Sequence, residues 1–249
     1  MFIRLFFLMI SFIFFLSCKK QSDRSCFKNT GSIIEKNIPL SAFSALDLGP
    51  YIHYELIQDT VNFLEISAGE NLINFISTEI NAEKLSIQNN NKCRFLRYKT
   101  EKISVKIHLS DLDLIYYHGS EPLISLDTLD FSQKGIIINL DDCSSSVNLK
   151  LKAKNILLNS PGGFSDITLA GSCDFFRVDI DGNSSFFAKN LFVKDSIHLL
   201  YNSFLYSELG SNNCKLKAEL SGVGDVGYFG IPSGILTNYY NSGRLIDKN

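Results

Sequence analysis

Aspartates near turns are the side chains of this sequence with the clearest potential for acid–base chemistry. Asp141, Asp142, Asp166, Asp181 and Asp225 could line a cleft in which one carboxyl group donates a proton and another accepts it, as in β-helical proteins that act on polysaccharides. Each of them lies at or near a turn-like segment, where aspartate is favoured because its side chain bonds to the local backbone. We therefore favour a structural role for all five and predict no catalytic residue.

Serine and histidine give no stronger indication of catalysis. Ser120, Ser160 and the run Ser144–Ser146 have neither a Gly-x-Ser-x-Gly frame nor an obvious histidine partner. His118 stands beside Gly119 at a predicted turn, which is typical of a surface residue. These patterns predict that the protein is not an enzyme.

The segment Ser221–Asp225, with the sequence SGVGD, superficially resembles a glycine-rich phosphate loop. It lacks the lysine that should follow and the helix whose N-terminus would hold the phosphate. We therefore predict a corner between strands, with glycine present because the corner needs positive φ.

Six cysteines and four histidines could in principle hold a metal ion. No Cys-x-x-Cys occurs, and the histidines are scattered through the chain. We predict neither a metal site nor a cofactor. The sequence positions in question are Cys18, Cys26, Cys93, Cys143, Cys173, Cys214, His53, His108, His118 and His198.

The N-terminus predicts export and lipidation. Arg4 precedes an apolar run from Leu5 to Leu16, which has the length of a signal h-region and is too short to span a bilayer. Ser17 then precedes Cys18, which is the pattern at which lipoproteins are processed. We predict a signal peptide over residues 1–17 and a lipid-modified Cys18 as the mature N-terminus. The alternative is an ordinary secretory signal with a chance cysteine.

The composition favours strands. The chain has 249 residues, of which 45% are hydrophobic, with 20 Phe and 10 Tyr but no Trp. The net charge is −2, and Lys and Arg do not cluster, so we predict no nucleic-acid partner. Residues 18–30 are polar and read as a tether between the lipid and the fold.

Short strand-like runs separated by turn residues follow over residues 31–110, the predicted N-terminal β region. In the run from Ile103 to Leu109, four apolar residues alternate with polar ones and so share one face. Asn71–Ile80 fits either a short helix or another strand.

The second half repeats with a period of about 20 residues, and we predict regular rungs over residues 111–243. Five ungapped blocks cover residues 144–163, 164–183, 184–203, 204–223 and 224–243, with turn-like pairs such as Asp181-Gly182 at one phase. A fixed period with strand content is typical of a solenoid, in which stacked rungs share one core. We predict an all-β, single-stranded, right-handed β-solenoid (β-helix-like) of about 20 residues per rung. A β-sandwich with evenly spaced hairpins is the alternative.

The solenoid has specific consequences for residues twenty apart. Ile167 should lie between Val147 and Phe187, and the blocks' last residues should form a line of corners. The third block is one position out of phase, which a one-residue bulge would repair. Pro232 should protect the terminal rung from edge-to-edge pairing, because it donates no ladder bond.

Several segments make the chain similar to a known family. Ser67–Leu72 (SAGENL) and Gly230–Pro232 (GIP) are the most distinctive of them, and Asn91–Arg94 (NKCR) also matches. On these segments the chain resembles the head GIN domain family of auto-transporter adhesins (DUF2807), which is common in Bacteroidetes lipoproteins, over roughly residues 31–246. The resemblance implies a β-solenoid at the envelope and no established activity. Because Cys93 lies in a family-like segment, we predict that it pairs with Cys26.

These observations predict a non-enzymatic cell-envelope lipoprotein that presents a solenoid surface for binding or adhesion. Its expected partners are the membrane, through the lipid anchor, and a glycan or an envelope protein. The expected location is the outer membrane, with its periplasmic and external faces both open. The alternative is a β-helix protein that binds or degrades polysaccharide.

Overall fold

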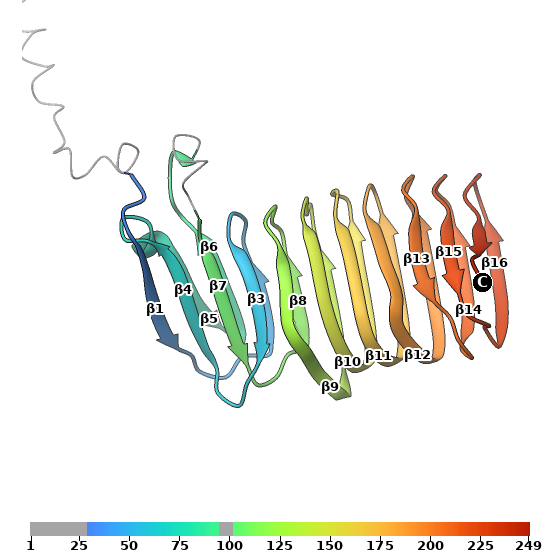
Figure 1. The fold of residues 1–249 in the computed structure, drawn as a ribbon, viewed down its shortest axis with the longest axis horizontal. Coiled ribbons are helices and arrows are strands. Elements are labelled where there is room, and N and C mark those ends of the chain that lie inside the picture. Colours follow the sequence, from blue (N-terminus) through green and yellow to red (C-terminus); the bar gives the residue numbers. More distant parts are fainter. Residues whose placement is uncertain (1–28, 95–101) are drawn as a thin grey trace, which may run out of the picture.

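Alternating apolar and polar residues fold the repeats of β9 to β12 into one long strand each, which bends in its middle, whereas the later repeats consist of two shorter strands each. The computed structural model describes residues 29–94 and 102–249. In the repeat strand β10 (Ser146–Pro161), Val147, Leu149 and Leu151 are buried, and after the bend Ile156 and Leu158 are buried. The stacked strands form a β-solenoid of about 7 turns with roughly 20 residues per turn (Figure 1). The predicted solenoid is confirmed.

The bends divide the coil into two sets of paired strands, called face 1 and face 2, and the core lies between them. Face 1 contains, in spatial order, β1 (Ile33–Pro39), β4 (Phe63–Gly69), β7 (Ser104–Leu109), β3 (His53–Gln58), the first arms of β9 (Leu123–Leu140), β10, β11 (Asp166–Asp181) and β12 (Ser185–Asn202), then β13 (Ser207–Gly210), β15 (Val226–Phe229) and β17 (Leu245–Asp247). Face 2 contains β5 (Ile76–Asn81), β6 (Lys84–Asn89), β2 (Ala45–Leu48), β8 (Leu114–Tyr117), the second arms of β9 to β12, β14 (Lys215–Leu220) and β16 (Gly234–Tyr239).

The N-terminal strands do not stack in chain order. The rung made by β2 and β3 lies between the rung of β6 and β7 and the rung that begins with β8, and these three pair in parallel. Strands β1, β4 and β5 pair antiparallel and cover this end of the coil. The segment Asn71–Ile80, for which helix and strand were both open, contains both: a 3₁₀ helix at Ile73–Phe75 leads into β5.

The register confirms most of the predicted stacking. Val147 pairs with Ile167 and Leu149 pairs with Leu169, each at a spacing of 20. The expected contact of Ile167 with Phe187 is wrong by one residue, because Ile167 pairs with Phe186. Two register shifts along β11 and β12 then bring Phe176 opposite Ile197, so the irregularity predicted in the third block is present.

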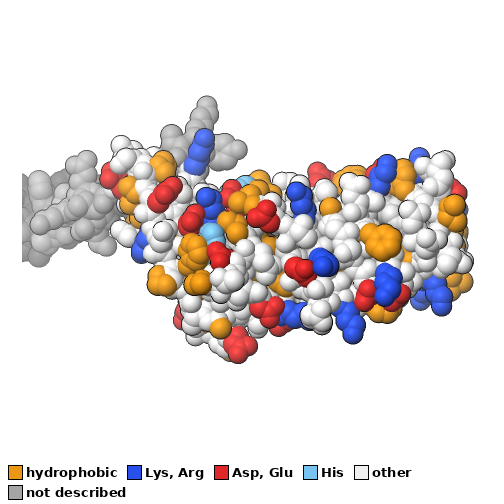
Figure 2. Space-filling view, turned by 60° about the horizontal axis from the view of Figure 1, so that its bottom comes forward, with side chains coloured by type: hydrophobic (Ala, Val, Ile, Leu, Met, Phe, Trp, Pro, Cys, Tyr) orange, Lys and Arg blue, Asp and Glu red, His pale blue; other side chains and the backbone are white. Residues whose placement is uncertain are grey.

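The outside of the coil carries both signs of charge. Figure 2 shows acidic, basic and hydrophobic side chains interspersed, without one continuous basic stripe on the face in view. Lys106 lies 3.3 Å from Glu65, and Lys152 lies 3.2 Å from Asp130 on the neighbouring rung. Such exposed pairs contribute at most about 1 kcal/mol each, so they suit a solvated surface more than they stabilise the coil.

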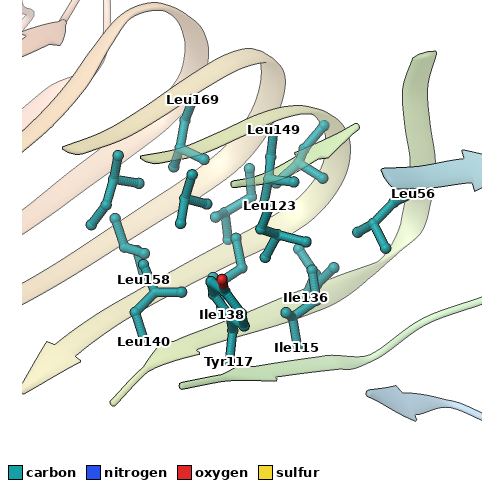
Figure 3. Close-up of a cluster of buried hydrophobic side chains, with 14 of the residues drawn as sticks. Leu56, Ile115, Tyr117, Leu123, Ile136, Ile138, Leu140, Leu149, Leu158 and Leu169 are labelled. Atoms are coloured by element: carbon teal, nitrogen blue, oxygen red, sulfur yellow. The ribbon is translucent and has the colours of Figure 1, made fainter. Parts of the chain in front are cut away.

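One hydrophobic core runs through the coil. Leu149 and Leu169 point inward from successive rungs, opposite Leu140 and Leu158 from the other face (Figure 3). All four side chains are fully buried. Burial of such a side chain stabilises a fold by roughly 1.5–3 kcal/mol, and each rung here buries its side chains against two neighbours.

The corners between face 2 and face 1 lie in a line, as predicted from the block ends. Asn183 donates its backbone N–H to the Gly163 carbonyl at 3.3 Å, and Gly243 donates to the Gly222 carbonyl at 3.2 Å. Gly163 has a φ of +86°. A side chain on Gly222 would collide with the backbone of Ser203 one rung away, so close approach of the corners requires glycine there.

Buried tyrosines tie the corners to the core. The Tyr201 hydroxyl donates to the Leu205 carbonyl at 2.8 Å and lies 2.9 Å from the Ser207 hydroxyl. Tyr117 donates in the same way to the Glu121 carbonyl, four residues ahead. Burial raises the pKa of the Tyr201 phenol. These bonds satisfy polar groups that would otherwise be costly to bury.

The two ends of the coil differ. The antiparallel strands cover the first end, whereas β16 and β17 are edge strands that leave Ile235 and Tyr239 exposed. Pro232 was expected to protect this edge, but it lies two residues before β16. The expectation is wrong, because the edge strand β16 contains no proline and Pro232 therefore removes no N–H group from it.

Cys143, Cys173 and Cys214 are free and buried, as predicted for small core residues. Burial raises the pKa of the Cys143 thiol to about 11 and of the Cys173 thiol to about 12. Cys93 is disulfide-bonded. The predicted partner Cys26 lies outside the described residues.

We expect the three core thiols to resist alkylation at pH 8 in the native protein, because little thiolate forms below a raised pKa and the side chains are inaccessible. Iodoacetamide should label them only after denaturation, and Cys93 only after reduction. Non-reducing peptide mapping should link Cys93 to Cys26, a pairing that stays a prediction. Labelling of native Cys173 at the rate of a free thiol would contradict the buried arrangement.

Candidate functional site: a basic cleft at the N-terminal corners

The aspartates considered for acid–base chemistry do not converge. Asp141 accepts a hydrogen bond from Tyr116 at 2.8 Å, and Asp166 accepts one from Ser185 at 2.6 Å. Asp181 accepts from Asn202 at 2.8 Å, and Asp225 accepts from the Arg244 backbone at 2.8 Å. Each bond connects one rung with another. These four carboxylates therefore connect neighbouring rungs, whereas the sequence analysis expected them to bond the local backbone of their own turns.

Ser160 and His118, two of the other sequence candidates, also have structural partners. Ser160 is fully buried and bonds Ser184 at 3.0 Å. His118 lies on the outer surface, 3.5 Å from Asp47. Ser221–Asp225 forms a corner, as predicted, but the reason given for its glycines is wrong: neither Gly222 nor Gly224 has positive φ, and both are required by close approach to the preceding rung.

The predicted lipidation site Cys18 and the predicted disulfide partner Cys26 lie outside the described residues, as do the signal peptide and most of the tether. Both assignments remain predictions.

A large cleft lies where three corners meet, a feature the sequence did not predict. The corners precede β3, β7 and β9, and Tyr51, Arg94 and Glu121 project from them. These corners are adjacent because the rung of β2 and β3 lies between the other two. The cleft has a volume of about 1260 Å³.

Tyr51 is the centre of this arrangement. Its backbone N–H donates to the Glu121 carboxylate at 2.6 Å, and its carbonyl accepts from the Asn89 side chain at 3.2 Å. The Arg94 guanidinium lies 3.4 Å from the centre of its ring, a cation–π contact. Tyr51 has a φ of +67°, a conformation that costs a non-glycine residue roughly 1–3 kcal/mol and that concentrates at functional sites.

Polar side chains of face 1 form the floor. His53, Ser104 and Ser67 are cross-strand neighbours on β3, β7 and β4 and point outward. The His53 ring lies 3.2 Å from the Glu55 carboxylate. This floor provides hydroxyl and imidazole groups that can donate and accept hydrogen bonds to a bound molecule.

The cleft is basic although the chain is slightly acidic. Arg94 and Lys102 line it together with Lys92, and among the described lining residues Glu121 is the one carboxylate. Glu121 already accepts bonds from the Tyr51 backbone and from the Ser120 hydroxyl at 3.0 Å. A cleft that is lined mainly by positive charges, beside the low-dielectric protein interior, raises the local concentration of anionic ligands.

Within residues 29–94 and 102–249 no group of three or more His, Cys, Asp or Glu side chains could hold a metal ion. The same part of the chain contains no helix long and apolar enough to cross a membrane. The fold and the cleft define the class: a β-solenoid with a ligand-sized cleft at one end.

The sequence identifies the family. Residues 42–232 match the family described as "Putative auto-transporter adhesin, head GIN domain", and the chain belongs to it. No curated protein matches the sequence.

Solved structures share the fold. A "putative adhesin" from Bacteroides fragilis is 17% identical with a TM-score of 0.76, covering 87% of this chain and 97% of that one. A "putative adhesin" from Parabacteroides distasonis is 19% identical with a TM-score of 0.67, covering 88% and 98%. A "Putative lipid binding protein" from the same organism is 16% identical with a TM-score of 0.65, covering 89% and 98%.

Proposed function

We propose that the protein is a non-enzymatic lipoprotein of the cell envelope that binds a glycan or an envelope protein through its solenoid. The family match over residues 42–232, whose description names an adhesin, carries this proposal. Asp141, Asp166 and Ser160 support it, because each of them bonds its rung to another part of the coil. The signal-like N-terminus and Ser17-Cys18 support anchoring in the outer membrane.

The anchor has a direct test. In cells grown with labelled palmitate, the wild-type chain should incorporate label, and Cys18→Ala should lose all of it and leave the membrane fraction, because two or more acyl chains are needed for stable anchoring. Cys26→Ala is the matched control and should keep the label. Label on the Cys18→Ala chain, or an N-terminus elsewhere by mass spectrometry, would contradict the assignment.

The binding role has a separate test. Protease treatment of intact cells decides which face of the outer membrane carries the chain, and a glycan array with the purified chain tests for a ligand. Binding to neither glycans nor envelope proteins would overturn the proposed function.

A further inference from the structure

The cleft combines three features. Arg94 and Lys102 line it, Tyr51 places an aromatic ring there from a strained backbone conformation, and Ser67 and Ser104 provide hydroxyl groups in its floor. Small residues such as Gly163, Gly182 and Gly222 stack on one another at the corners of the repeats, although Phe164 and Phe204 are exposed beside them. The corner at Tyr51 also projects a large side chain, 43% exposed, and the Arg94 guanidinium lies over its ring.

The network around Tyr51 holds the site in place before any ligand binds. Glu121 and Asn89 fix the backbone of Tyr51 from the two neighbouring corners, and Arg94 covers one side of the ring. The Arg94 guanidinium also donates to the Asn89 carbonyl at 3.4 Å. Since arginine has five N–H donors in a planar fork, this single bond leaves donors for a carboxylate.

The size of the cleft favours an extended ligand. Its volume of about 1260 Å³ exceeds the roughly 300–1000 Å³ of ordinary small-molecule pockets. A chain of sugar rings matches its contents: hydroxyls for Ser67 and Ser104, a ring face for Tyr51, and an acidic group for Arg94 and Lys102.

We propose that this cleft binds a carboxylated oligosaccharide, with Arg94 and Lys102 receiving the carboxylate and Tyr51 stacking on a sugar ring. The inference rests on the proposed binding function and narrows its ligand class.

The test uses the full lipidated chain in detergent and two probes, a tri- to hexameric galacturonate oligomer and its methyl ester, which is neutral. Titration calorimetry should show that the acid binds at least about tenfold more tightly than the ester, since hydrogen bonds to an ionised carboxylate are stronger than those to a neutral ester. Raising the salt concentration should weaken binding of the acid.

The variants locate the site. Arg94→Ala and Lys102→Ala should each weaken binding of the acid about tenfold or more. Tyr51→Gly should weaken both probes while keeping the backbone, because glycine accepts φ of +67°. Lys150→Ala is the matched control: it removes an exposed lysine from β10, away from the cleft, and should bind like the wild type. Circular dichroism of each variant shows whether it is folded.

The contrary outcomes are distinct. Equal binding of acid and ester, or unchanged binding in both Arg94→Ala and Lys102→Ala, overturns the carboxylate assignment while leaving adhesion intact. Tighter binding of a polyglutamate peptide than of the oligosaccharide replaces the glycan by a protein ligand. Absence of any glycan or envelope-protein binding would remove the proposed function itself.

Discussion

An Ile167→Asp chain should lose the folded state of its own rung and of both neighbours. Ile167 is fully buried and pairs with Val147 on one side and Phe186 on the other. The substitution removes apolar burial and places a carboxylate where no described group is positioned to pair with it. Loss of the large side chain alone costs about 2–5 kcal/mol, and an unpaired buried charge adds to that, so we expect at least about 5 kcal/mol.

The loss should spread because the core is continuous. In a stacked coil each rung is stabilised mainly by its neighbours, so one damaged rung weakens the contacts on both sides. Hydrogen exchange should therefore become fast in β10 and β12 as well as in β11. Asn148→Asp adds the same charge at an exposed outward position next to Val147 and should change stability by no more than about 0.5 kcal/mol. Fast exchange confined to β11 would contradict the shared core.

The period in the sequence predicted the rungs because strand side chains alternate with a period of two. Any residue of the core face must then lie above another core residue, and equal blocks keep that phase, as Val147 and Ile167 do. Local bulges are invisible to such counting. The spacing from Ile167 is 19 residues, to Phe186, whereas from Phe176 it is 21, to Ile197. Spacings of 19 and 21 residues average 20 over one turn of the coil. The period of 20 was therefore correct, although the predicted partner Phe187 was wrong.

The cleft could not be predicted, because the N-terminal rungs stack in space in an order that differs from their order along the sequence. Arg94 and Glu121 flank Tyr51 only because the rung of β2 and β3 is inserted between those of β6–β7 and β8–β9. No periodicity in residues 31–110 indicates this arrangement. The one local signal was Pro50-Tyr51, a proline followed by a bulky residue at a turn, and it does not reveal which corners lie beside it.

Gly171 should be the least replaceable glycine of the coil. It lies inside β11, near the bend, with a φ of +115°. A methyl group there would overlap the backbone of Leu151 on the preceding rung, which cannot move without breaking its own pairing. Gly171→Ala therefore combines backbone strain of roughly 1–3 kcal/mol with an overpacking cost of similar size, and we expect a loss of about 3 kcal/mol or more.

Gly234→Ala is the matched control, since the same methyl group at Gly234 meets no atom within 4 Å and its φ is not positive. It should leave the stability unchanged within about 0.5 kcal/mol or raise it slightly by restricting the unfolded chain. Urea denaturation of the three proteins compares the midpoints directly. If Gly171→Ala unfolded at the wild-type midpoint, the rungs would have to separate at the bend more easily than their continuous pairing allows.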